Sequence, residues 1–318
     1  MGNEFLDLAR QGKNDWPRYV LSLAVILTSW LFVGSLAFLV FVGPQMGPYL
    51  NQRVESGAAL PGGSEVEQFL ATVDPLATYL GLSATFVFLV LGLLVAVKLI
   101  HQRPFLTLIT TRASFDWRRA GQGFVWWFGL SLAAAAVEAL LYPGRYQLTF
   151  NFRSFFIFLP FVLILTPIQT TAEELLFRGY LMQGVGLLVR RWLLPAILTS
   201  LLFGVLHGGN PELSTGGPLL LAVYFGSGLL AALLTLRDNR LELAIGYHAA
   251  NNVFGALVAN YAVSALPTPA VFTIMQNDVI YGLLSFAIMA AVFYVGVFRF
   301  HAGSGPPPLP SDEGARGG

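Results

Sequence analysis

Three short groups of polar residues interrupt apolar stretches in the second half of the chain. In chain order they are Glu173-Glu174-x-x-x-Arg178, Phe203-x-x-x-His207 and His248-x-x-x-Asn252. Ionisable side chains within a membrane-spanning segment are energetically costly, so their presence indicates a function. Carboxylate, imidazole and amide groups together can hydrolyse a peptide bond, because a base activates water and N–H donors stabilise the oxyanion that forms.

Helical spacing assigns different tasks to the two adjacent carboxylates. Positions i and i+4 of a helix share a face, so Glu174 and Arg178 can form an ion pair, with the acid on the favourable N-terminal side. Glu173 lies about 100° further round the helix and lacks this intrahelical partner. We therefore predict that Glu174 is neutralised and that Glu173 is free to act as a general base.

The same spacing places His248 and Asn252 on one helical face, where an imidazole and an amide can donate to an oxyanion. Asn251 is an alternative amide donor. Phe203 is predicted to pack against His207 and fix it. A histidine or an asparagine in such a segment can instead serve only to pack or to bridge helices.

The heights of two of these residues can be compared if the fourth and fifth apolar segments form an antiparallel hairpin near residues 190–191. Glu173 lies about 17 residues before that turn and His207 about 16 after it, so both lie roughly 25 Å from the turn. Residues 208–211 would then begin inside the bilayer, which requires cover by protein or a wet cavity. A loop outside the bilayer is the alternative.

The composition assigns the elements that carry these residues to a membrane. The chain has 318 residues, of which 55% are hydrophobic and 11% charged, and its mean hydropathy is +0.66. Soluble domains carry roughly 25% charged residues, so this set cannot cover a water-exposed surface. We predict an all-α polytopic integral membrane protein with about eight transmembrane helices. The segments are Tyr19–Val42, Leu76–Ile100, Phe124–Leu141, Phe155–Phe177, Trp192–Leu206, Pro218–Leu236, Leu243–Ala265 and Val279–Val297.

Basic residues are distributed unevenly between the connections, which predicts an orientation. Eight crossings place fifteen on one side: Arg10, Lys13, Arg18, Lys98, Arg103, Arg112, Arg118, Arg119, Arg178, Arg190, Arg191, Arg237, Arg240, Arg299 and Arg316. The other side keeps Arg53, Arg145 and Arg153. Both termini are therefore predicted to be cytoplasmic. We also expect residues 105–119 to form an interfacial helix.

The same reading divides the chain into three parts. Residues 1–18 form a cytoplasmic N-terminal segment, 19–301 a membrane-embedded domain, and 302–318 a Gly/Pro-rich tail predicted to be disordered. The net charge of +1 gives no bulk attraction to nucleic acid, so no nucleic-acid partner is expected. The chain has no cysteine, which excludes thiolate chemistry and disulfides.

The three motifs, in this order, resemble those of the CPBP family of intramembrane proteases, which includes the Rce1-type CAAX prenyl endopeptidases and bacterial Abi/immunity-type relatives. The resemblance covers a motif core at about residues 170–255. It implies that Glu173 and His207 activate the attacking water and that His248 and Asn252 bind the oxyanion. Glu174 and Arg178 would hold the site in shape. The implied partners are membrane lipid and a peptide or membrane-anchored protein substrate, with or without a lipid.

Alternatives to this reading stay open. Glu173, His207 and His248 have the ligand types of a His₂Glu zinc site, so a divalent metal is not excluded. We favour no cofactor, because His248 and Asn252 pair as an oxyanion site. A second alternative is a non-catalytic immunity or adaptor protein of the same fold. A third is a proton-coupled transporter, in which a buried acid and histidines relay protons.

Overall fold

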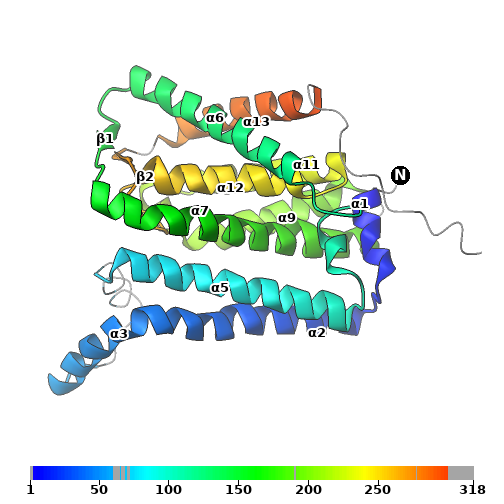
Figure 1. The fold of residues 1–318 in the computed structure, drawn as a ribbon, viewed down its shortest axis with the longest axis horizontal. Helices are drawn as coiled ribbons and strands as arrows, with labels where there is room; N and C mark the ends of the chain where they lie inside the picture. Colours follow the sequence, from blue (N-terminus) through cyan, green and yellow to red (C-terminus); the bar gives the residue numbers. More distant parts are fainter. Residues whose placement is uncertain are drawn as a thin grey trace, which may run out of the picture.

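Long helices lie side by side and form almost the whole molecule (Figure 1). This computed structural model describes residues 3–59, 65, 69, 72–189, 191–276 and 278–299. The long helices are α2 (Trp16–Leu27), α3 (Gly34–Glu55), α5 (Pro75–Val95), α6 (Trp117–Leu141), α7 (Phe152–Glu174), α9 (Leu193–Leu206), α11 (Leu220–Asp238), α12 (Glu242–Leu257) and α13 (Val279–Arg299). The predicted tail 302–318 lies outside the described residues.

Shorter helical pieces extend or join these helices. Among them, α1 (Glu4–Asp7), α8 (Met182–Leu188) and α10 (Leu213–Gly216) are α-helical. The 3₁₀ turns are η1 (Leu8–Gln11), η4 (Phe105–Leu108) and η6 (His207–Gly209). The π-helical segments are η2 (Thr28–Val33), η3 (Ala96–Ile100) and η5 (Leu175–Leu181). Segment η5 joins α7 to α8, so one continuous helix runs from Phe152 to Leu188.

Several long helices begin at an acidic or amide side chain that caps the first turn. In each case the side-chain oxygen accepts a hydrogen bond from the backbone N–H three residues later, which satisfies one of the donors that a helix leaves unpaired. The capping residues are Asp15 of α2, Asp74 of α5, Asp116 of α6 and Asn151 of α7. These caps fix where the membrane helices start.

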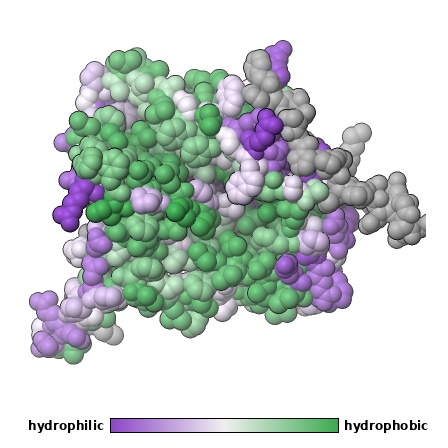
Figure 2. Space-filling model, viewed as in Figure 1, coloured by the Kyte–Doolittle hydropathy of each residue, from purple (hydrophilic) through white to green (hydrophobic). Residues whose placement is uncertain are grey.

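Within the described part of the chain, six helices are long and apolar enough to span a membrane: Trp16–Glu55, Pro75–Ile100, Trp117–Leu141, Phe152–Leu188, Leu220–Asp238 and Val279–Arg299. An apolar surface covers the middle of the bundle and polar residues gather at its two ends (Figure 2). The prediction of an all-α polytopic membrane protein is therefore confirmed. The count of eight is not, because α9 and α12 measure only about 21 and 24 Å, against a hydrocarbon core of about 30 Å.

Two other predictions about single segments differ from the structure. The predicted span to Ala265 ends at Leu257, because the next residues form strand β2 (Ala259–Tyr261). The predicted interfacial helix over residues 105–119 is wrong, since only η4 is helical before α6 begins at Trp117. Leu108 is fully buried against Gly179 instead, so this segment is folded into the end of the bundle.

Short strands close one end of the bundle and the N-terminal segment closes the other (Figure 1). Strand β1 (Tyr146–Leu148) pairs antiparallel with β3 (Phe272–Ile274), and β2 pairs parallel with β3, in the order β1-β3-β2. At the opposite end Asn3 Nδ2 donates to Leu236 O at 2.8 Å. Asn3 and helix α1 after it are thus packed onto the bundle beside the end of α11.

Helix α12 is the centre of the packing and carries most of its residues buried between α6, α7 and α11. Two glycines allow its close crossing with α6. A Cβ on Gly246 would collide with Ala120 O, and a Cβ on Gly123 would lie 2.5 Å from Leu243 O. Small residues permit such backbone contact between membrane helices. This crossing fixes the depth at which α12 presents its polar residues.

Candidate active site

Helix α12 presents His248 toward the C-terminal turn of α7, where the two carboxylates lie. His248 Nδ1 donates to Glu174 Oε1 at 2.8 Å, and Arg178 Nη1 donates to the same oxygen at 2.9 Å. Arg178 Nη2 reaches across to Gly228 O of α11 at 2.8 Å. Glu174 is 1% exposed and Arg178 is 0% exposed, so these charges are removed from both water and lipid. One buried network therefore joins three helices.

The position of Gly228 is explained by this network. A Cβ added there would lie 3.1 Å from Arg178 Nη2 and 3.3 Å from the Cα of Ser200 on α9. Glycine therefore lets α11 approach both the guanidinium and the neighbouring helix. A buried ion pair is more stable when its hydrogen-bonding groups are satisfied. The Gly228 carbonyl satisfies one Arg178 donor, whereas Arg178 Nε and Glu174 Oε2 have no hydrogen-bond partner among the described residues.

Glu173, the predicted base, faces the other ring nitrogen of His248. Its Oε2 lies 3.8 Å from His248 Nε2, which is too long for a hydrogen bond. Its Oε1 accepts from Gln169 Nε2 at 3.3 Å. Glu173 is 7% exposed, and Oε2 has no hydrogen-bond partner among the described residues. A buried carboxylate oxygen of this kind is able to accept a proton from a third group.

His207 lies at the C-terminal end of α9 and is oriented by its own helix. Its Nδ1 donates to Phe203 O at 2.7 Å, which leaves Nε2 as the nitrogen directed away from the helix. The ring of Phe203 lies 4.3 Å from the ring of His207 and 5.9 Å from that of His248, centroid to centroid. Phe203 thus lies next to both histidines.

Asn252 lies one turn beyond His248 on α12. Its Oδ1 accepts from Asn251 Nδ2 at 3.2 Å, and Asn251 Oδ1 accepts from Trp127 Nε1 of α6 at 3.3 Å. With its oxygen occupied in this way, Asn252 offers its NH₂ group as a donor. Trp127 was not found from the sequence, because its contact with Asn251 spans 124 positions and leaves no periodic signal.

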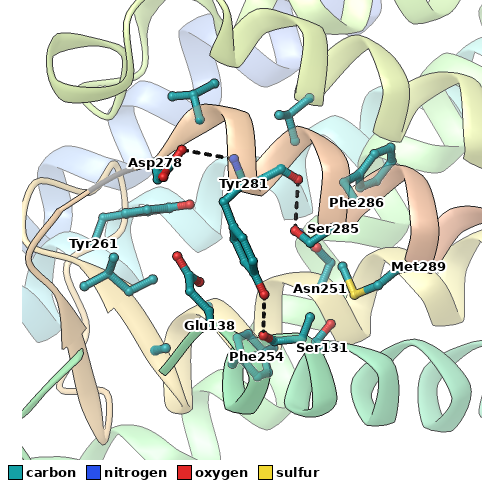
Figure 3. Close-up of a pocket in the computed structure, with 18 of the residues that line it drawn as sticks. Ser131, Glu138, Asn251, Phe254, Tyr261, Asp278, Tyr281, Ser285, Phe286 and Met289 are labelled. Atoms are coloured by element: carbon teal, nitrogen blue, oxygen red, sulfur yellow. Dashed lines mark hydrogen bonds between the residues drawn. The ribbon is translucent and has the colours of Figure 1, made fainter. Parts of the chain in front are cut away.

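A cavity of about 240 Å³ is lined mainly by residues of α6, α12 and α13, with Leu220 and Val223 of α11, and Asn251 is part of its wall. Figure 3 shows Tyr281 projecting into it, with Glu138 nearby. Glu138 is ion-paired with Arg145 at 3.1 Å, as their proximity in the sequence suggests. None of Glu173, His207, His248 and Asn252 lines this cavity, so it is a neighbour of the candidate site and not the site itself.

Comparisons with known proteins place this arrangement in a family. A protein of Bacillus subtilis strain 168 that is named uncharacterized protein YyaK is 30% identical to the chain over 294 residues, which cover 90% of this chain and 92% of that protein. The family model of the type II CAAX prenyl endopeptidase Rce1-like proteins matches residues 152–254. The chain belongs to the Rce1-like family. No solved structure matches it.

The matched region of this Rce1-like protein contains all seven motif residues and runs from α7 into α12. Membership assigns the chain to the CAAX-protease-like hydrolases in general and, with six apolar helices, to the multi-pass integral membrane proteins. The predicted resemblance to the CPBP and CAAX protease family is confirmed.

The ligand types predicted for a metal site do not converge in this Rce1-like protein. Among the residues that the structure describes, no group of three or more His, Cys, Asp or Glu side chains is placed to hold a metal ion. In this arrangement Glu173, His207 and His248 are therefore not gathered into a three-ligand zinc site.

Proposed function

We propose that this Rce1-like protein is an intramembrane endopeptidase that hydrolyses peptide bonds in or next to the bilayer. The observation that carries the proposal is the Oε2 atom of Glu173. It is buried, has no hydrogen-bond partner among the described residues, and faces His248. A carboxylate held in this way can take a proton from water as the water oxygen attacks a carbonyl carbon.

The Glu174–Arg178 network supports a donor role for His248. The ionised Glu174 accepts from Nδ1, so donation from Nε2 requires a proton on both ring nitrogens. With His248 in this form, its charge and that of Arg178 balance the two carboxylates, and the buried cluster is neutral overall. A neutral cluster is the least costly arrangement in a membrane interior.

The hydrolysis then proceeds through a tetrahedral intermediate. Glu173, assisted by His207 Nε2, takes a proton from water while the water oxygen bonds to the scissile carbon. His248 Nε2–H and Asn252 Nδ2–H stabilise the oxyanion. The proton then passes to the leaving nitrogen and the C–N bond breaks. The substrate class is a peptide or a membrane-anchored protein, and a lipid on it is compatible with this chemistry but is not needed for it.

Proteolysis by the purified protein in detergent tests the proposal. A quenched peptide library that includes prenylated members is incubated with the wild type, Glu173→Gln and His207→Ala, each with and without a chelator. Glu138→Gln is the matched control, since Glu138 is another glutamate near a helix end, paired with Arg145, but it contacts none of Glu173, His207 and His248. We expect cleavage by the wild type and the control, its loss in both site variants, and no effect of the chelator.

Cleavage that survives in Glu173→Gln would show that this carboxylate is not the base. Cleavage abolished by the chelator and restored by zinc would contradict the metal-free mechanism. Two results together would support a non-catalytic role instead. The purified wild-type protein would cleave no member of the library, and cells that carry Glu173→Gln would keep the protein's cellular function.

A further inference from the structure

His207 has weak support from the chain that follows it. It ends α9 and is followed by Gly208 and Gly209, at which an added Cβ would meet no atom within 4 Å. No side chain or backbone therefore packs where a Cβ of either glycine would lie, and glycine itself restricts the backbone little. Phe203 contacts His207 in two ways: its carbonyl oxygen accepts from His207 Nδ1 and its ring packs against the imidazole. Both contacts come from the same helix as His207, so they cannot by themselves fix the imidazole relative to the rest of the site.

Tyr224 of α11 supplies a contact from a different helix. Its ring lies 4.6 Å from the ring of His207, centroid to centroid, with an angle of 28° between the planes, which is a stacked arrangement. Aromatic pairs at such distances and angles contribute beyond the area that they bury. Since α11 also carries Gly228, the acceptor for Arg178, this stack places His207 relative to the network around Glu174.

The hydroxyl group of the same tyrosine holds the chain after the two glycines. Asn210 Nδ2 donates to the Tyr224 hydroxyl at 3.1 Å. Tyr224 therefore contacts both the imidazole ring and the first side chain beyond the flexible Gly208–Gly209 pair. The Tyr224 side chain thus contacts the residue before the two glycines, His207, and the residue after them, Asn210.

Close packing of α9 on α11 sets the height of this contact. A Cβ on Gly204 would lie 3.3 Å from Phe225 N, and a Cβ on Gly228 would lie 3.3 Å from the Cα of Ser200. The two helices therefore approach backbone to backbone at two points, Ser200 and Gly204, in the turns of α9 that precede His207, as small residues allow in membranes. Any change in this approach would shift the Tyr224 ring along His207.

We propose that Tyr224 is a positioning residue for His207 and that its ring and its bond to Asn210 together direct His207 Nε2 toward the attacking water. The role toward water rests on the proposed function, whereas the fixation of the ring does not. Tyr224 has no distinctive spacing in the sequence, and its bond to Asn210 connects the segment after the motif histidine to α11.

The ring fixation is tested by NMR of the full-length protein in detergent with ¹³C-labelled histidine. The chain has four histidines, so comparison with His207→Gln assigns the His207 signals. A proton over the face of an aromatic ring is shifted upfield. We therefore expect the His207 ring signals of the wild type and Tyr224→Phe to lie upfield of their positions in Tyr224→Leu. Tyr281→Leu, which alters a tyrosine outside the histidine cluster, should leave them unchanged.

Unchanged His207 signals in a folded Tyr224→Leu protein would overturn the proposal. If that variant does not fold, Asn210→Ala decides, because it removes only the bond to the hydroxyl group. In Asn210→Ala we expect the His207 ring signals to shift downfield by less than in Tyr224→Leu. Spectra of Asn210→Ala and the wild type with identical His207 signals would again overturn the proposal.

Kinetics separate this inference from the proposed function. Once a cleaved peptide is known, kcat of Tyr224→Leu should fall roughly 10- to 100-fold, as for a misplaced catalytic group, with KM unchanged. Tyr224→Phe keeps the stack and should lose about 5-fold or less. A displaced His207 signal together with a wild-type kcat would contradict the positioning role. Absence of cleavage by the wild type would contradict the proposed function and leave the NMR result as the test of the stack.

Discussion

His248 and Glu174 are joined by a hydrogen bond of 2.8 Å from Nδ1 to Oε1, the oxygen that also accepts from Arg178. A single carboxylate oxygen therefore fixes an imidazole from α12 and neutralises a guanidinium from its own helix. The consequence is that Glu174 orients the Nε2 side of His248 toward Glu173. Stability and site geometry depend on the same atom.

Replacement of Glu174 by Gln tests this dependence. The substitution keeps the shape but leaves the buried Arg178 without a counter-charge, and removal of one partner from a buried pair destabilises a protein by about 3–5 kcal/mol. We expect a clearly lower melting temperature in detergent. Asp7→Asn is the control, since the Asp7–Arg10 pair is about half exposed and such pairs contribute only about 0.5 kcal/mol. Equal melting shifts in the two variants would contradict a structural role for this ion pair.

A methyl group at position 228 should disturb the same network from the opposite side. Gly228→Ala places a Cβ 3.1 Å from Arg178 Nη2 and 3.3 Å from Ser200, so the helices must separate or the guanidinium must move. Overpacking of this kind destabilises by about 1–3 kcal/mol. Gly129→Ala in α6 is the matched control, because a Cβ there meets nothing within 4 Å and helix propensity improves. Thermal unfolding of the two variants should therefore shift in opposite directions.

Contacts between side chains of the same helix could be predicted from the sequence. The spacing of Glu174 and Arg178 predicts their ion pair, which the structure shows at 2.9 Å. The same reasoning could not find His248 as the second partner of Glu174, because the two lie 74 positions apart and only helix packing brings them together. Tyr224 was missed for the same reason, since a tyrosine in an apolar helix has no distinctive spacing.

Hydropathy predicted where helices lie better than where they end. Residues after Leu257 are as apolar as the helix before them, yet they form β2, because pairing with β3 satisfies their backbone at the end of the bundle. Segment 105–119 mixes apolar and basic residues as an interfacial helix does, but Leu108 is buried against Gly179. In both cases long-range packing outweighs the local pattern.

A buried histidine outside the membrane-spanning helices predicts a dependence of stability on pH. His101 Nδ1 donates to Lys13 O at 2.7 Å and Nε2 lies 3.0 Å from the Tyr180 hydroxyl group, from which neutral imidazole can accept. Burial lowers the pKa of His101 below its usual value of 6.5. The unfolded chain therefore binds this proton first as the pH falls.

The stabilising contribution of neutral His101 should be complete above about pH 6.5 and should decline as the pH falls from there through the lowered pKa of the folded state. Melting temperatures measured across this range in detergent should show the decline in the wild type and a weaker one in His101→Gln. A decline of the same size in both proteins would assign the pH dependence to other groups.

The orientation of the chain can be tested because it contains no cysteine, so a single introduced thiol reports its own side. Ser56 and Gln11 are exposed and lie on opposite sides of the first long apolar helix, Trp16–Glu55. The excess of Arg and Lys on the side of Gln11 predicts that this side is cytoplasmic. A membrane-impermeant maleimide should label Ser56→Cys in intact cells and Gln11→Cys only after permeabilisation. Labelling in the reverse pattern would place the termini outside, and the charge bias would then need another cause.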